Sequence, residues 1–164
     1  MQHWIDDNFG VVFAIGFPLF FVTMWTCASY GVAFLGGWRL LAQRFRAPGD
    51  FSGQKWRMER ASMRFGCHYN NILTVGADQF GLFVATFILF RPGHPALFVP
   101  WTEISVERKT QLFFFKVVEL RLGRSENVPF AIREALAAKL EAAAGSGWPT
   151  GYAHALETPP KPIE

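Results

Sequence analysis

A long uncharged segment near the N-terminus constrains this chain more than any other feature. No Asp, Glu, Lys or Arg occurs from Asn8 to Trp38. This run exceeds the roughly 20 residues that a helix needs to cross a bilayer. It is too short for two spans and a turn. The sequence therefore predicts one tilted transmembrane helix over 9–38, with Pro18 as the place for a kink.

A cleaved signal peptide is the alternative reading of this segment. The residues before it read MQHWIDD and are acidic, whereas a signal peptide begins with a basic region. The apolar run is also far longer than the roughly 7–15 residues of a signal-peptide core. Both observations favour a retained span.

The charges on either side of the run predict its orientation. Asp6 and Asp7 precede it, whereas three arginines, Arg39, Arg44 and Arg46, follow it. Because basic residues next to a span stay in the cytoplasm, residues 1–8 are expected outside and the rest of the chain inside. Tryptophans are expected as anchors at the two interfaces, namely Trp4 and Trp38.

Small residues recur at every fourth position near the end of the predicted span, at Ser29, Ala33 and Gly37. Such a stripe lets the backbone of another helix approach closely. The pattern predicts a helix–helix contact here, with a second copy of the chain or with another membrane protein.

A basic juxtamembrane segment, 39–53, follows the span. Residues 39–64 hold 7 of the 16 basic residues of the chain. Trp38, Leu41 and Phe45 share one face at helical spacing, which predicts a short helix lying along the lipid headgroups. The residues expected to contact the membrane surface are Trp38, Arg39, Arg44, Arg46, Lys55 and Arg57.

The basic segment has two explanations. The arginines simply record the topology of the span, or they recognise an acidic lipid. Non-specific attraction to anionic headgroups contributes about 1 kcal/mol per basic residue near the surface. Nucleic acid is not expected as a partner, because the bilayer competes for this patch and no nucleic-acid-binding motif is present.

The pattern becomes strand-like after residue 54, which predicts a β-rich domain over 54–145. Short apolar runs alternate with polar residues or are rich in Phe, Val and Ile. The last two predicted strands form an antiparallel pair that turns near 109–111. Strands are predicted over 72–75, 80–90, 98–101, 104–107 and 118–122.

The segment 129–144 predicts a C-terminal amphipathic helix. Ile132, Leu136 and Leu140 repeat every four residues, and Pro129 is allowed in a first helical turn. Residues 146–164 contain four prolines and are expected to form a flexible tail. The predicted fold class is α+β: a transmembrane helix, a mainly antiparallel sheet or partly open barrel, and this helix.

The stretch FRPGHPALFVPWTEI interrupts the strand-like region. Pro92, Gly93 and Pro95 force the chain out of the sheet after Phe90, since proline lacks a donor and glycine allows left-handed dihedrals. The stretch therefore predicts a turn between strands, with His94 exposed at its tip.

Catalytic motifs do not emerge from the sequence. No serine lies in a G-x-S-x-G setting, and neither an H-E-x-x-H motif nor a phosphate-binding glycine loop occurs. Cys67 and His68 are adjacent, but neighbours on a strand point to opposite faces and do not readily share a metal or a proton. We expect no enzyme, cofactor or metal.

The order Tyr69-Asn70-Asn71, then Leu73 to Asp78, then Gly81-Leu82-Phe83, and then FRPGHPALFVPWTEI resembles a group of small bacterial single-span membrane proteins of unassigned function. Together with the strands and the final helix, it is similar to a pleckstrin-homology-like (PH-like) or GRAM-like domain tethered to a membrane. The resemblance covers 38–144.

The resemblance implies a protein of the bacterial inner membrane with its domain in the cytoplasm. The resemblance does not imply a function; our first hypothesis is a non-enzymatic interaction module that presents this domain to the cytoplasmic leaflet or to a protein partner. The alternative is an accessory structural subunit of a larger membrane complex. A likeness of fold does not by itself transfer a ligand.

Overall fold

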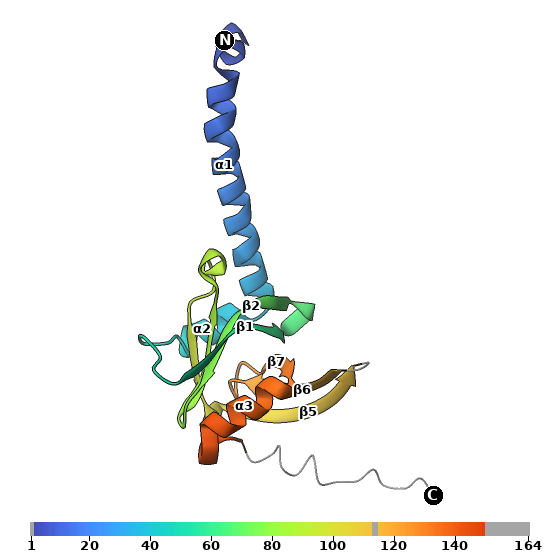
Figure 1. The fold of residues 1–164 in the computed structure, drawn as a ribbon. Coiled ribbons are helices and arrows are strands. Elements are labelled where there is room, and N and C mark those ends of the chain that lie inside the picture. The colour runs from blue at the N-terminus through green and yellow to red at the C-terminus, as the bar shows by residue number, and fades with distance from the viewer. Residues whose placement is uncertain (1, 113–114, 150–164) are drawn as a thin grey trace, which may run out of the picture.

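The computed structural model describes residues 2–112 and 115–149. A long helix, α1 (Gln2–Leu35), projects from a compact domain, and α2 (Trp38–Arg44) follows it at the domain surface (Figure 1). The helix α3 (Glu134–Ala144) lies at the opposite end of the domain from α1. The strands are β1 (Gln54–Ser62), β2 (His68–Ala77), β3 (Gly81–Thr86), β4 (Leu97–Pro100), β5 (Ile104–Leu112), β6 (Phe115–Leu122) and β7 (Val128–Arg133).

The seven strands form one antiparallel sheet in the order β4-β3-β2-β1-β7-β6-β5, which curls into a nearly closed barrel. β1 joins the two halves, because it pairs with β2 and, through Ala61 and Ser62, also with β7. Register shifts lie between Trp56 and Ala61. Such bulges bend a strand and increase its twist, which allows β1 to pair with both β2 and β7. The α+β class predicted from the sequence is confirmed.

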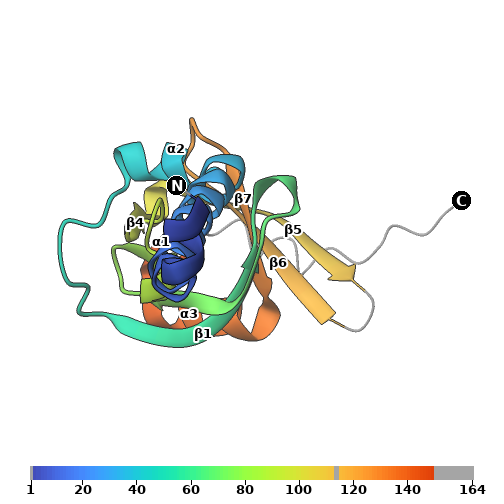
Figure 2. The ribbon, with the colours of Figure 1, turned by 90° about the horizontal axis from the view of Figure 1, so that it is seen from above.

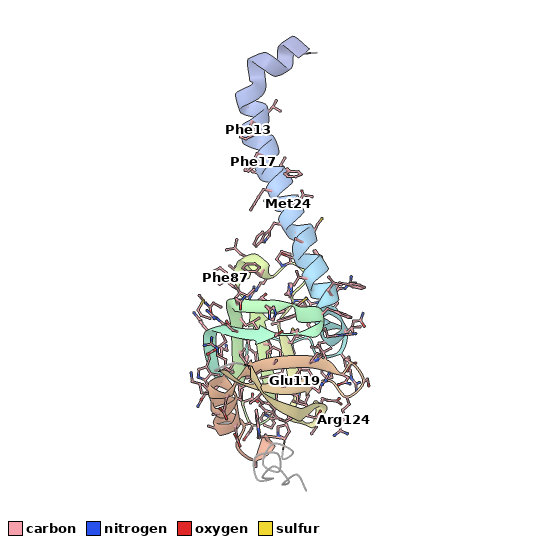
Figure 3. All side chains as sticks on the ribbon, turned by 90° about the vertical axis from the view of Figure 1, so that its right-hand side faces the viewer. Phe13, Phe17, Met24, Phe87, Glu119 and Arg124 are labelled. Atoms are coloured by element: carbon pink, nitrogen blue, oxygen red, sulfur yellow. The ribbon has the colours of Figure 1, made fainter. Side chains whose placement is uncertain are left out.

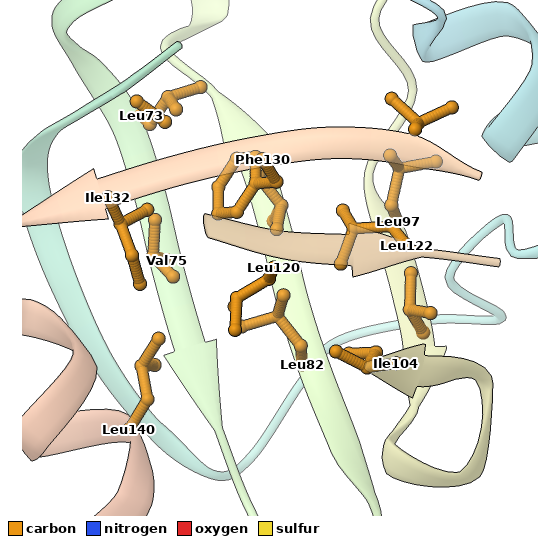
Figure 4. Close-up of a cluster of buried hydrophobic side chains, with 14 of the residues drawn as sticks. Leu73, Val75, Leu82, Leu97, Ile104, Leu120, Leu122, Phe130, Ile132 and Leu140 are labelled. Carbon is orange, nitrogen blue, oxygen red and sulfur yellow. The ribbon is translucent and has the colours of Figure 1, made fainter. Parts of the chain in front are cut away.

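Alternating apolar residues of the strands fill the interior of this sheet (Figure 4). Val118, Leu120 and Leu122 of β6 are buried, whereas Glu119 and Arg121, which alternate with them, are partly exposed and form an ion pair of 3.1 Å. This is the period of two expected of a half-buried strand. Leu140 from α3 closes one end of the core.

The C-terminal helix is shorter than predicted. It begins at Glu134 and not at 129, because 128–133 forms β7 and pairs with β6. Pro129 lies beyond the residues of β7 that pair with β1, at a place in the ladder where a missing N–H is tolerated. The apolar stripe persists within the helix, where Leu136, Leu140 and Ala144 are buried.

Two other local predictions were wrong. The strand expected over 80–90 ends at Thr86, and a single 3-10 turn, η2 (Ile88–Phe90), follows it. The turn expected near 109–111 does not occur there, because Lys109, Thr110 and Gln111 pair with β6. The residues between β5 and β6 lie outside the described part of the chain.

Helix α1 is long and apolar enough to span a membrane over Gly10–Leu35. It starts at Gln2 and ends at Leu35, so it is displaced toward the N-terminus relative to the predicted 9–38. Gly37 ends it in a left-handed conformation with φ of 83°, which glycine adopts without steric cost. Seen along α1, the helix stands over the barrel while the β5–β6 hairpin extends sideways (Figure 2).

The start of the predicted tail belongs to the folded domain, since a 3-10 turn covers Gly145–Gly147. Trp148 is buried, and its ring centroid lies 5.2 Å from that of Trp101. The remainder of the predicted tail, 150–164, lies outside the described residues.

Candidate functional site

The base of α1 packs against the domain's own Pro-Gly-His-Pro loop. Ser29 and Ala33 are buried. A methyl group added at Gly93 would lie 3.2 Å from the Cβ of Ala33. At Gly37, an added methyl would meet Val128 at 3.1 Å. These small residues therefore pack largely within the same chain in this structure, and the predicted contact with a helix of another chain stays a prediction.

Three rings join α2, β2 and this loop, namely those of Trp38, Tyr69 and His94. His94 is only 3% exposed, in contrast to the exposed tip predicted for it. Its ring lies 5.0 Å from that of Trp38 and 5.6 Å from that of Tyr69, both edge to face. Trp38 is fully buried, and its Nε1–H donates to the carbonyl of Pro95 at 2.8 Å. Trp38 therefore fixes the loop and does not contact headgroups as predicted.

The hydrogen bonds of His94 identify its neutral form. Nδ1 lies 3.2 Å from the carbonyl of Pro92, which can only accept, so Nδ1 carries the proton. Nε2 lies 3.1 Å from the hydroxyl of Tyr69 and accepts from it. Burial lowers the pKa of His94 and raises that of Tyr69. Both groups are therefore uncharged near neutral pH, which suits a structural joint and not proton transfer.

The stability of this joint is expected to fall in mild acid. Because the folded pKa of His94 is below its unfolded value of about 6.5, the unfolded chain binds a proton first as the pH drops. The stabilisation is complete above pH ~6.5 and is lost as the pH falls toward the folded pKa. Thermal unfolding of the full chain in detergent between pH 8 and 5 measures this loss.

The control for this titration is a second histidine. The loss of thermal stability between pH 8 and 5 should be smaller in His94→Gln than in the wild type. It should be unchanged in His68→Gln, since His68 is exposed. An identical pH dependence in wild type and His94→Gln would contradict the assignment.

An apolar tip, Phe87–Phe90, rises beside α1. Ile88 is 65% exposed and Leu89 62% exposed, although both are large and apolar. The Nε1–H of Trp25 in α1 donates to the carbonyl of Leu89 at 3.0 Å, and the rings of Trp25 and Phe90 lie 5.1 Å apart. Figure 3 shows Phe87 on the side of the domain from which α1 projects, whereas Arg124 lies lower on the domain, away from α1.

Two hollows flank the Pro-Gly-His-Pro loop. One is a cleft of about 710 Å³ that includes Arg39, Arg46 and Arg91 in its lining. The other is an apolar groove of about 250 Å³ between Trp25, Val32 and the domain. Arg39 and Arg46 were predicted from the sequence to contact the membrane surface, but Arg91 was not. Arg91 comes close to α2 only because the loop folds back against it.

The other predicted basic residues lie elsewhere. Arg44 forms ion pairs with Glu103 and Glu126 at 3.6 and 3.8 Å. Lys55 and Arg57 belong to the start of β1, where Lys55 pairs with Gly76 at the end of β2 that approaches α3. These three are therefore not brought together with Arg39 and Arg46.

Among the described residues, no group of three or more His, Cys, Asp and Glu side chains is placed to hold a metal ion. Cys67 lies just before β2 and is partly buried, whereas His68 is exposed. Comparison of the chain with protein-family models, with curated proteins and with solved structures found no match.

Proposed function

We propose that this chain is a single-span membrane protein whose PH-like domain is held against the cytoplasmic leaflet as a non-enzymatic interaction module. The observation that carries the proposal is the contact between Trp25 of α1 and the apolar tip at Leu89. It joins the domain to the helix well inside the segment that is apolar enough to span a membrane.

The surface of α1 supports a lipid environment. Its apolar side chains point in all directions, and Phe13, Phe17 and Phe20 are each more than half exposed. A helix that is apolar all round requires an apolar environment on every side. Within the described residues, the domain covers only the base of this helix (Figure 1). Hydrocarbon would cover the rest.

The depth of the apolar tip follows from helix geometry. A hydrocarbon core of about 30 Å takes about 20 residues of helix at 1.5 Å per residue. Wherever such a window is placed within Gly10–Leu35, Trp25 lies about 4 to 10 residues from its domain end, which is roughly 6–15 Å along the helix. The tip that contacts Trp25 would thus enter the hydrocarbon.

Three backbone carbonyls of the tip have hydrogen-bond partners, which favours burial in hydrocarbon. The carbonyls of Phe87, Ile88 and Leu89 accept hydrogen bonds from Phe90 N–H, Arg91 N–H and the Trp25 indole respectively. Unsatisfied backbone groups are costly in hydrocarbon, so these bonds lower the cost of insertion. The exposed side chains of Ile88 and Leu89 would gain by leaving water.

The orientation rests on charge. Arg39, Arg46 and Arg91 lie on the domain side of α1, and basic residues beside a span remain in the cytoplasm. The acidic residues of MQHWIDD precede the apolar segment. This supports a domain in the cytoplasm of a bacterial cell, with the N-terminus on the other side of the inner membrane.

Thiol accessibility tests docking and orientation together. In a chain with Cys27 and Cys67 replaced by serine, single cysteines are introduced as Ile88→Cys or Ala138→Cys. Both positions are exposed in the protein, so only lipid can shield one of them. A membrane-impermeant maleimide should label neither in intact cells. In inverted membrane vesicles it should label Ala138→Cys rapidly and Ile88→Cys slowly.

Both cysteines should react fully after denaturation in SDS, which controls for intrinsic reactivity. Equal labelling rates in inverted vesicles would place the tip in water and contradict the docked domain. Labelling of Ala138→Cys in intact cells would contradict the orientation.

A further inference from the structure

The cleft beside α2 gathers three arginines from separate parts of the chain. Arg39 lies in the first turn of α2, Arg46 follows that helix, and Arg91 follows η2. All three are exposed. The residues that line the cleft include no Asp or Glu. Arg44, in contrast, forms ion pairs with Glu103 and Glu126. The cleft is therefore positively charged without an internal counterion in the described structure.

The backbone around Arg46 and Arg91 is fixed by hydrogen bonds between the segment after α2 and the loop, and within the loop itself. Arg46 forms a β-bridge with Leu97, and the N–H of Ala47 donates to the carbonyl of Ala96 at 2.8 Å. The N–H of His94 donates to the carbonyl of Arg91 at 2.9 Å. Side chains on a backbone held in this way lose less freedom when they bind a ligand.

The location of the cleft indicates the source of its ligand. Arg91 directly follows the apolar tip, and Tyr30 of α1 lines the same cleft. In the docked arrangement proposed above, the arginines then stand just outside the hydrocarbon, where phospholipid phosphates lie. Guanidinium groups bind phosphate oxygens through two parallel hydrogen bonds, which an ammonium group does not provide.

We infer that this cleft binds the phosphate of an anionic phospholipid headgroup through Arg39, Arg46 and Arg91. The inference rests on the proposed membrane docking. It differs from general attraction to an anionic surface, because three arginines converge on one cleft while Lys55 and Arg57 lie away from it. A bound headgroup would fix the domain in one orientation on the leaflet.

The test uses the full chain in nanodiscs of neutral phosphatidylcholine that contain a small fraction of spin-labelled lipid. Electron paramagnetic resonance measures the lipid immobilised by the protein. Spin-labelled phosphatidylglycerol should be preferred over spin-labelled phosphatidylcholine about tenfold, the ratio that corresponds to about one net hydrogen bond to a charged group. The preference should persist at about 0.5 M salt, where delocalised attraction is screened within about 4 Å.

Two matched double variants test whether the preference for phosphatidylglycerol arises from the cleft. Arg46→Gln with Arg91→Gln should abolish it. Arg57→Gln with Lys139→Gln removes the same charge from exposed positions away from the cleft and should leave it unchanged. Equal effects of the two pairs, or no effect of the first, would overturn the inference. Displacement of the lipid by millimolar inorganic phosphate would also overturn it, since the ligand would then be free phosphate.

The docking experiment separates the two proposals. Ile88→Cys should stay protected from maleimide in the Arg46→Gln, Arg91→Gln chain if only the headgroup contact is lost. A protected tip without lipid preference in the wild type would refute the headgroup site alone. An unprotected tip in the wild type would refute the docking on which the site depends.

Discussion

The chain carrying Leu136→Asp is expected to lose most of the folding free energy of its β-sheet domain. Leu136 is 2% exposed and packs in the core as part of α3. An aspartate there would bury an unpaired carboxylate and remove apolar contacts, at a cost of several kcal/mol. This is comparable to the roughly 5–15 kcal/mol that stabilises a whole domain. Thermal unfolding of the detergent-solubilised chain, followed by circular dichroism, measures the loss.

Ala138→Asp is the matched control for this variant. It adds the same charge to the same helix two residues later, where the side chain is exposed. Its melting temperature should stay close to that of the wild type. If both variants melted at the same temperature, α3 would not be docked through Leu136.

Trp38→Ala is expected to cost about 3–5 kcal/mol, the range for removing a large buried ring. Trp38 is fully buried and contacts His94 and Tyr69, so its loss would open a cavity at the junction of α1 with the domain. Urea unfolding of the solubilised chain should show a lower midpoint. Protease cleavage near Gly36 should also become faster, because α1 would be held less firmly.

Two further substitutions calibrate this loss. Trp38→Phe keeps much of the ring but removes the hydrogen bond to Pro95, and should cost less than Trp38→Ala. Leu40→Ala changes a partly exposed neighbour on the same helix and should have little effect. A Trp38→Ala chain as stable as Leu40→Ala would show that this ring does not join α1 to the domain.

The sequence predicted what depends on local pattern. The uncharged run predicted a single long helix, and the alternation in 72–75, 104–107 and 118–122 predicted strands that the structure contains. These signals arise because each element meets one environment along its length. The apolar face of 38–45 was also found correctly, but it packs on the domain and not on headgroups. Periodicity identifies a buried face without identifying what covers it.

The wrong boundaries of the predicted strand 80–90 and of the predicted helix 129–144 also arise because local pattern does not reveal tertiary contacts. The residues Phe87–Phe90 have the composition of a strand, yet the chain leaves the sheet at Thr86 and exposes Phe87, Ile88 and Leu89. The spacing of Ile132 and Leu136 fits a helix, although pairing with β6 places Ile132 in β7. Tertiary contacts override local preference in both places: contact with Trp25 at Leu89 and Phe90, and strand pairing at Ile132.

The candidate site was the least predictable part. His94 was predicted to be an exposed loop residue, and the sequence pattern predicted no role for Arg91. Both acquire their surroundings only when 91–96 folds against α1 and α2. Contacts between residues so distant in sequence leave no pattern in a single chain, and a proline-rich turn looks the same whether it faces water or a helix.

Because β1 pairs with both β2 and β7, the barrel can close only late in the synthesis of the chain. Ala61 pairs with Ile132, which leaves the ribosome long after it, so the two halves of the barrel cannot join until β7 has been made. In the proposed topology, α1 has entered the bilayer by then. Strand pairing between distant residues is slow and leaves edges open to aggregation. Closure would thus take place beside the membrane, on a chain already anchored and kept apart from the pool of free, aggregation-prone polypeptides.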